Sequence, residues 1–183
     1  MLFALLLSAC QPDFLRSSEV DRPRAGSAAW VVDGHALRLE EHILTADGVP
    51  LLEHVYDEPV VGDHVLYVPA DPGPGDGGIY AVRIVDGAVR AVPILEEGRP
   101  DRLALAPDGT TLAYVAGTSG IASVWVVPVA GGRPRQLTNV NLASTPGRAP
   151  ADFVHPPDDG PVQFVGSRVV WVARGAEREA TWR

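Results

Sequence analysis

The sequence of 183 residues contains no lysine, and its single cysteine is Cys10. Without lysine there can be no GxxxxGK[ST] loop, which excludes nucleotide binding of the P-loop type. The basic residues are all arginines that form no cluster, and the net charge is −8, so we expect no nucleic-acid partner. A single cysteine also excludes an internal disulfide, even in an oxidising compartment.

Catalytic and metal-binding motifs are absent as well. The sequence has no GxSxG, HExxH or GxGxxG motif and no Cys/His cluster, so we expect no enzyme activity, cofactor or metal from it. Five histidines are scattered along the chain, and His35 and His42 are the nearest pair. Their odd spacing predicts that they lie on opposite faces of one strand. The other three are His54, His64 and His155.

Long apolar runs and a helical composition are also missing. No apolar run approaches the roughly 20 residues that cross a bilayer as a helix. Glycine and proline together make about one residue in five, which argues against a helix bundle because both are poor inside helices. This composition predicts an all-β chain of many short strands joined by tight turns.

The first ten residues, MLFALLLSAC, contain a short apolar run of signal-peptide length, Leu2–Leu7. The run closes with Leu7-Ser8-Ala9-Cys10, which resembles the bacterial lipobox, whose cysteine becomes a lipidated N-terminus. The resemblance implies a signal peptide over residues 1–9, lipidation of Cys10, a polar tether over residues 10–25 and, from Gln11, the outer membrane. No basic residue precedes the run, and the alternative is a buried N-terminal strand with a free cysteine.

Four later segments share one pattern, a turn followed by an apolar strand that carries an aromatic residue. The aromatics are Trp30, Tyr67, Tyr114 and Trp171, and their separations of 37, 47 and 57 residues scatter about the length of a four-stranded propeller blade. Glycine-containing pairs separate the strands that follow, which indicates hairpins because such turns need positive φ. These pairs are Asp33-Gly34, Asp47-Gly48, Asp86-Gly87 and Gly131-Gly132.

One stretch, residues 99–138, carries a Pro107-Asp108-Gly109 turn, the Gly131-Gly132 turn and a closing Leu137-Thr138. These features resemble the repeat of TolB-type, WD-repeat-like β-propellers. The resemblance implies an all-β repeat domain of antiparallel propeller blades over residues 26–183. The blades would cover residues 26–59, 60–98 and 99–150, with a partial blade at 161–183.

Three and a fraction blades make an incomplete propeller, because propellers typically have four to eight. Arg183 falls where the third strand of the fourth blade is expected to begin. Either the natural protein continues, or an oligomer completes the ring, or the last segment, ATWR, closes it. Trp182 lies in this polar tail and is expected to be exposed.

The long loops, 69–78 and 139–160, are the expected binding loops. The stretch from Asp71 to Gly78 could wrap a cation or be a plain connecting loop, and the acidic run Glu53, Asp57, Glu58 and Asp63 could meet a cation or a basic partner or be a solvated edge. The sequence therefore favours a lipid-anchored envelope propeller without catalysis, which binds a protein partner or itself. The alternative is the propeller part of a larger prolyl-oligopeptidase-like hydrolase.

Overall fold

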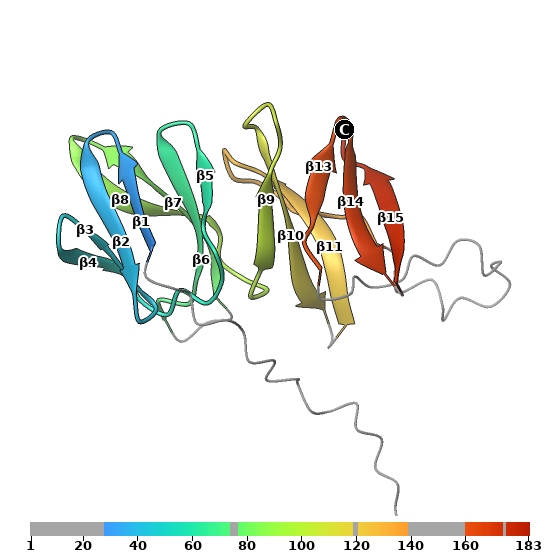
Figure 1. Cartoon of the computed structure of the whole chain (residues 1–183), viewed down its shortest axis with the longest axis horizontal. Helices are drawn as coiled ribbons and strands as arrows, with labels where there is room; N and C mark the ends of the chain where they lie inside the picture. Colours follow the sequence, from blue (N-terminus) through green and yellow to red (C-terminus); the bar gives the residue numbers. More distant parts are fainter. Residues whose placement is uncertain (1–27, 74–76, 119–120, 139–159, 174) are drawn as a thin grey trace, which may run out of the picture.

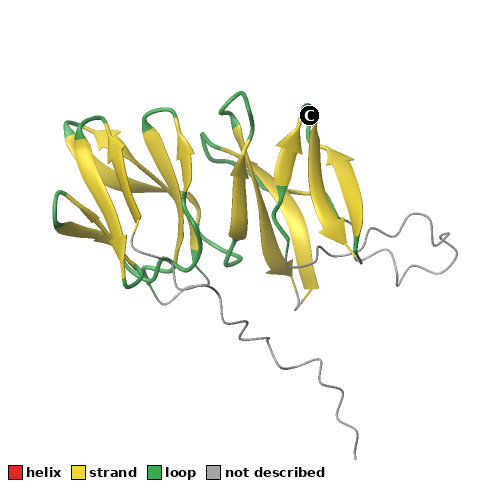
Figure 2. Ribbon diagram, in the orientation of Figure 1, coloured by secondary structure: helices red, strands yellow, loops and turns green. Residues whose placement is uncertain are grey.

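The computed structural model describes residues 28–73, 77–118, 121–138, 160–173 and 175–183. These residues form strands and loops without a helix, so none of them belongs to a helix that could cross a membrane (Figure 2). The strands make four antiparallel sheets, which we call blades 1 to 4 in chain order (Figure 1). The all-β expectation is confirmed, with three blades of four strands and a fourth blade of three.

The strands follow one another in the sheets as they do along the chain. Blade 1 holds β1 (Ala28–Val32), β2 (His35–Glu40), β3 (Ile43–Ala46) and β4 (Val49–Leu52). Blade 2 holds β5 (Val60–Gly62), β6 (Val65–Ala70), β7 (Gly78–Val85) and β8 (Ala88–Leu95). Blade 3 holds β9 (Asp101–Leu105), β10 (Thr111–Thr118), β11 (Ile121–Pro128) and β12 (Arg135–Gln136). Blade 4 holds β13 (Gln163–Val165), β14 (Arg168–Ala173) and β15 (Ala176–Thr181).

Because the strands alternate in direction, the connections of each blade lie at two opposite ends. The turns from first to second strand and from third to fourth strand share one end, which we call the hairpin end. The turn from second to third strand and the link to the next blade share the other, the connection end. In Figure 1 the first hairpin of each blade points up.

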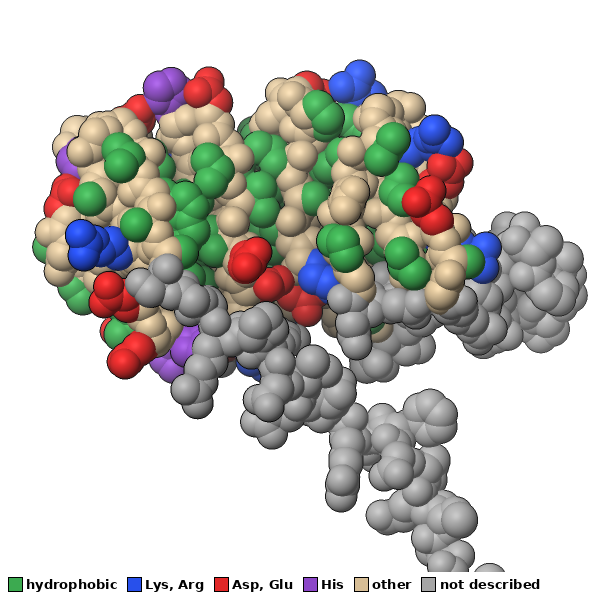
Figure 3. Space-filling model, in the orientation of Figure 1, with side chains coloured by type: hydrophobic (Ala, Val, Ile, Leu, Met, Phe, Trp, Pro, Cys, Tyr) green, Lys and Arg blue, Asp and Glu red, His purple; other side chains and the backbone are tan. Residues whose placement is uncertain are grey.

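The blades lie side by side in chain order (Figure 1). The first strands β5, β9 and β13 contact one another in turn, and the fourth strands β4 and β8 also meet. A buried hydrophobic cluster fills each of the three spaces between neighbouring blades. Hydrophobic side chains are visible along these seams in Figure 3. In a β-propeller each blade packs its face against the next blade along the chain. The four blades are packed in this way and form a partial propeller.

The repeated aromatics fall in these seams. Tyr67, Tyr114 and Trp171 are buried, and Trp30 is half-buried against the cluster between blades 1 and 2. Trp125 lies half-buried against the cluster between blades 2 and 3. These aromatic residues therefore pack between neighbouring blades.

Two expectations for the end of the chain were wrong. The third strand of blade 4 does not begin at Arg183, because β15 already pairs with β14 from Ala176 to Thr181. Trp182 is not exposed, since only 8% of its surface is accessible. The strand carries Trp182 onto the core face of blade 4, where its ring meets Phe164 edge-on at 5.2 Å and its Nε1 donates to the Gly166 carbonyl at 3.3 Å.

The predicted hairpin turns form where glycine supplies positive φ. Gly34, Gly48 and Gly87 have φ between 76° and 85°, and the aspartate before each is also left-handed. In the Pro107-Asp108-Gly109 turn, Oδ1 of Asp108 accepts hydrogen bonds from the backbone N–H and the hydroxyl of Thr110. These bonds lower the pKa of Asp108, because they favour the charged carboxylate.

One contact at the hairpin end joins the first hairpins of blades 1 and 2. The Nδ1 of His64 is hydrogen-bonded to Oδ1 of Asp33, and its Nε2 lies 3.4 Å from Oδ1 of Asp63. The bond to Asp33, with the charges of Asp33 and Asp63, raises the pKa of His64 above its ordinary value. Both partners are exposed, so the contact is screened by solvent.

This contact predicts a small pH dependence of stability. Because folding raises the His64 pKa, the contact stabilises the fold fully below the unfolded-histidine pKa of about 6.5, and the contribution is lost as pH rises through the folded pKa. NMR titration of the His64 ring should give a midpoint above that of a free histidine, and Asp33→Asn should lower it. Asparagine tolerates the left-handed φ of position 33. An unchanged His64 midpoint in Asp33→Asn would contradict the assignment.

Candidate functional site

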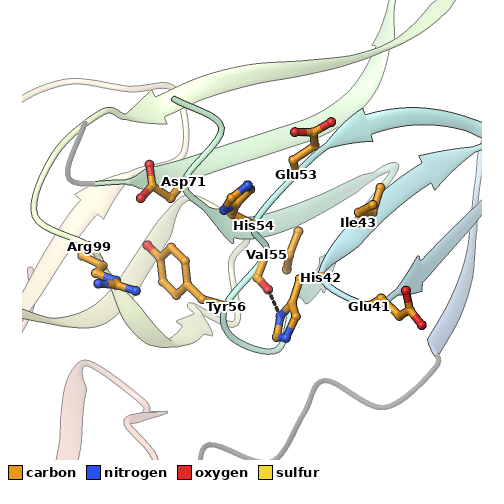
Figure 4. Close-up of a pocket in the computed structure, with 9 residues that line it drawn as sticks. All are labelled: Glu41, His42, Ile43, Glu53, His54, Val55, Tyr56, Asp71 and Arg99. Carbon is orange, nitrogen blue, oxygen red and sulfur yellow. Dashed lines mark hydrogen bonds between the residues drawn. The ribbon is translucent and has the colours of Figure 1, made fainter. Parts of the chain in front are cut away.

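Four separate segments meet at the connection end of blades 1 and 2 and line an open pocket of about 530 Å³ (Figure 4). They are the β2–β3 turn, the β4–β5 link, the start of the β6–β7 loop and the β8–β9 link. This volume is within the range of small-molecule sites, roughly 300–1,000 Å³. The lining residues are Glu41, His42, Ile43, Glu53, His54, Val55, Tyr56, Asp71 and Arg99.

Backbone pairing outside the regular sheets holds the floor of this pocket. Val55 forms an isolated antiparallel bridge with Ala70, the last residue of β6. Around it, the N–H of Tyr56 donates to the Pro69 carbonyl at 3.3 Å, and the N–H of Asp71 donates to the His54 carbonyl at 3.2 Å. The link between blades 1 and 2 is thereby tied to the end of β6, which positions three lining side chains.

Four residues that line the pocket have a left-handed backbone. Glu41, His42, His54 and Arg99 all have left-handed φ, at 49°, 69°, 54° and 40°. Residues other than glycine adopt this conformation at a cost, and such residues cluster at functional sites. The β2–β3 turn has Glu41-His42 where the hairpin turns of the same blade have Asp-Gly. The turn therefore has side chains at Glu41 and His42, although its left-handed backbone would favour glycine there.

His42 is oriented by a hydrogen bond within the pocket. Its Nδ1 donates to the carbonyl oxygen of Val55 at 2.7 Å, drawn as the dashed line in Figure 4. Because a carbonyl only accepts, Nδ1 carries the proton, and Nε2 of the neutral ring remains an acceptor. Val55 is fully buried, so this bond anchors the turn to the pocket floor.

Carboxylates dominate the charge of the pocket. The lining holds three carboxylates, Glu41, Glu53 and Asp71, and one cationic side chain. That cation is Arg99, whose guanidinium carbon lies 5.5 Å from the centre of the Tyr56 ring. Oδ1 of Asp71 is buried and has no hydrogen-bond partner among the described residues. The charge of Asp71 also reaches Tyr80, whose pKa is raised by burial first and then by Glu96 and Asp71.

The histidines that the sequence analysis singled out lie at both ends of the blades. His42 and His54 come together in the pocket, whereas His35 and His64 pair with aspartates at the hairpin end. The prediction that His35 and His42 share a strand on opposite faces was wrong, because β2 ends at Glu40 and His42 belongs to the following turn. In the parts of the chain that the structure describes, no three His, Cys, Asp or Glu side chains are placed to hold one metal ion.

The acidic run is likewise divided. Glu53 lines the pocket, Oδ2 of Asp57 accepts a hydrogen bond from the backbone N–H of Arg102, and Asp63 lies at the hairpin end beside His64. Of the expected binding loop 69–78, Asp71 lines the pocket, and residues 74–76 lie outside the described residues. Cys10, the segment 10–25 and loop residues 139–159 lie outside them as well.

Sequence reasoning missed Tyr56, Arg99 and the Glu41-His42 turn as site residues. Tyr56 and Arg99 belong to links between blades, where no periodic pattern marks them. A signal was present at Glu41-His42, since two strand patterns meet there without the glycine found in the neighbouring turns.

Comparison with known proteins adds little to this site. No protein family model matches the chain, and no curated protein sequence matches it. Among solved structures it is similar to the crystal structure of TolB from Acinetobacter baumannii, with 12% identity and a TM-score of 0.41. The match covers 85% of this chain and 40% of that chain, so the chain spans about two fifths of the length of that protein. The fold assignment rests on the four blades themselves.

Proposed function

We propose that this chain is a β-propeller module of the cell envelope that binds a partner at the connection-end pocket without catalysis. The observation that carries the proposal is the pocket itself, in which four separate segments hold a set of polar side chains on strained backbone. No serine, threonine or cysteine is among its lining residues, so nucleophilic catalysis of the hydrolase type has no candidate there. Binding is the function that such a lining supports.

We further propose that a lipid on Cys10 holds the module at a membrane, with the outer membrane favoured by Gln11. The support is the apolar run Leu2–Leu7 followed by Leu7-Ser8-Ala9-Cys10. The chain enters the fold at Ala28, which lies at the connection end because β1 runs from there toward the first hairpin. From Cys10 to that point an extended chain spans at most about 60 Å. The pocket would then face partners close to the membrane.

The anchor and the binding face can be tested together in the native host. The native chain should sediment with membranes and have the mass of residues 10–183 plus acyl chains, whereas Cys10→Ser should be released. A photo-crosslinking amino acid at Glu53, on the pocket rim, should give one discrete crosslinked species in the anchored chain and much less in Cys10→Ser.

The matched control places the same crosslinker at Glu177, an exposed residue of β15 in blade 4. Equal crosslinking from Glu53 and Glu177, or none from either, would refute the binding face. An unmodified mass beginning at Met1 would refute the anchor. A mass much larger than the chain would favour the hydrolase-linked alternative.

A further inference from the structure

We propose that the pocket binds an arginine side chain of a protein partner, with the Asp71 carboxylate as the acceptor and the Tyr56 ring as the face on which the guanidinium rests. This inference rests on the proposed function, since it names the chemistry of the group that the pocket receives. Three features of the described residues carry it, namely the charge of the lining, an acceptor without a donor and a cation already present on the ring.

The first feature is charge. With its histidines neutral, the lining carries three carboxylates and one guanidinium, a net charge of −2 on one small surface. An anionic ligand would be repelled by this surface, and a cationic group would be attracted to it. The described residues contain no cluster that could hold a metal ion. An organic cation is therefore the class of ligand that the charge favours.

The second feature is Asp71. Its Oδ1 is buried without a hydrogen-bond partner among the described residues, although a buried acceptor loses stability when no donor reaches it. The backbone N–H of Asp71 donates to His54, which ties the residue to the pocket floor. A guanidinium presents five N–H donors in a planar fork that matches a carboxylate, whereas an ammonium is a point charge. Because Oδ1 has almost no accessible surface, the Asp71 side chain must rotate before a partner donor reaches it, and the fork of an arginine then satisfies it better than a lysine does.

The third feature is the pairing of Arg99 with Tyr56. The guanidinium of Arg99 lies over the Tyr56 ring at 5.5 Å, a cation–π distance. The hydroxyl end of the ring packs closely against Gly77, because a Cβ added there would lie 3.1 Å from the Tyr56 hydroxyl oxygen. The pocket thus already accepts a guanidinium from its own chain, on a side chain that is exposed. A partner arginine would take the same ring face in its place.

The test measures binding of short peptides to the full chain in detergent micelles by isothermal titration calorimetry at 150 mM salt. The probes are Ac-Gly-Arg-Gly-Arg-Gly-NH₂ and its counterparts with lysine or glutamate in place of arginine. We expect the arginine peptide to bind best, the lysine peptide less well and the glutamate peptide not at all. Asp71→Asn should weaken arginine-peptide binding about tenfold, the usual effect of losing a charge-assisted hydrogen bond.

The matched control for charge is Glu177→Gln, which removes the same charge from an exposed position in blade 4. It should change binding less than about twofold, as expected of a distant surface charge at this salt concentration. Tyr56→Leu should weaken binding severalfold, while Tyr56→Phe keeps the ring face. Arg99→Ala should strengthen binding, because it removes the competing guanidinium. If Asp71→Asn does not fold, the comparison of Tyr56→Leu with Tyr56→Phe replaces it.

Equal losses in Asp71→Asn and Glu177→Gln would overturn the proposal, since the peptide would then sense only the net charge of the chain. Equal binding of arginine and lysine peptides would overturn the choice of guanidinium. If the Glu53 crosslinker captures a partner but the arginine peptide does not bind, the proposed function stands and this inference fails. If neither occurs, both fail.

Discussion

Replacing Gly78 by alanine is expected to lower the free energy of unfolding by at least about 3 kcal/mol, the upper part of the range for overpacked interiors. Gly78 is the buried first residue of β7, and a Cβ placed there would lie 2.1 Å from the carbonyl oxygen of Leu95. That oxygen belongs to the backbone of β8, so no rotamer change relieves the clash. The two strands must separate where the register between them already shifts, between Ile79 and Tyr80.

The matched control is Gly117→Ala. Gly117 lies in β10 with ordinary negative φ, and a Cβ there would have no neighbour within 4 Å. At such a position alanine stabilises by about 0.4–1 kcal/mol, because it restricts the unfolded chain. Urea unfolding followed by tryptophan fluorescence measures both variants. A Gly78→Ala chain as stable as Gly117→Ala would show that β7 and β8 are not packed as closely as described.

Replacing Trp171 by alanine is expected to cost about 3–5 kcal/mol of unfolding free energy, the range for large buried aromatics. Trp171 is 1% exposed and belongs to the cluster between blades 3 and 4, with Val115, Val124 and Val169. Among the described residues, blade 4 has three strands and packs against blade 3 alone, so this cluster is its main contact with the rest of the fold. The loss should therefore appear first as local opening of blade 4.

Hydrogen exchange distinguishes this local effect from a global one. In Trp171→Ala the amides of β13–β15 should lose protection before those of blades 1 and 2. Val172→Ala is the matched control, because the neighbouring side chain points to the opposite face and is 36% exposed. That change should cost less than about 1 kcal/mol. Uniform loss of protection in all four blades would contradict the expectation that blade 4 opens by itself when Trp171 is removed.

The turns and most strands could be predicted from local sequence because their causes are local. Asp-Gly pairs form hairpins since glycine and aspartate adopt the left-handed region at low cost, as they do at Asp33, Asp47 and Asp86. A continuous apolar run is the local pattern of a strand that is covered on both faces. In β6 every residue from Leu66 to Ala70 is buried. In β2, at the end of the array, Leu37 and Leu39 alternate with exposed Arg38 and Glu40.

The last strand of blade 4 and the burial of Trp182 could not be predicted in this way. The segment Ala176–Thr181 reads AEREAT, which lacks the alternation of a strand and has only one β-branched residue, Thr181. It is extended because all six of its residues pair with β14, a partner already present in space. Trp182 is buried for the same reason, since that pairing ends beside Phe164.

The sequence by itself therefore determined the repeat, the fold class and the hairpin turns, because these depend on residues near one another in the chain. Only the tertiary structure decided the pocket. Its residues come from turns within blades and links between blades, from Glu41 to Arg99, and no periodicity relates them. They meet because antiparallel blades in chain order bring every second-to-third-strand turn and every link to the same end. Packing of the blades then sets which of these side chains face one another.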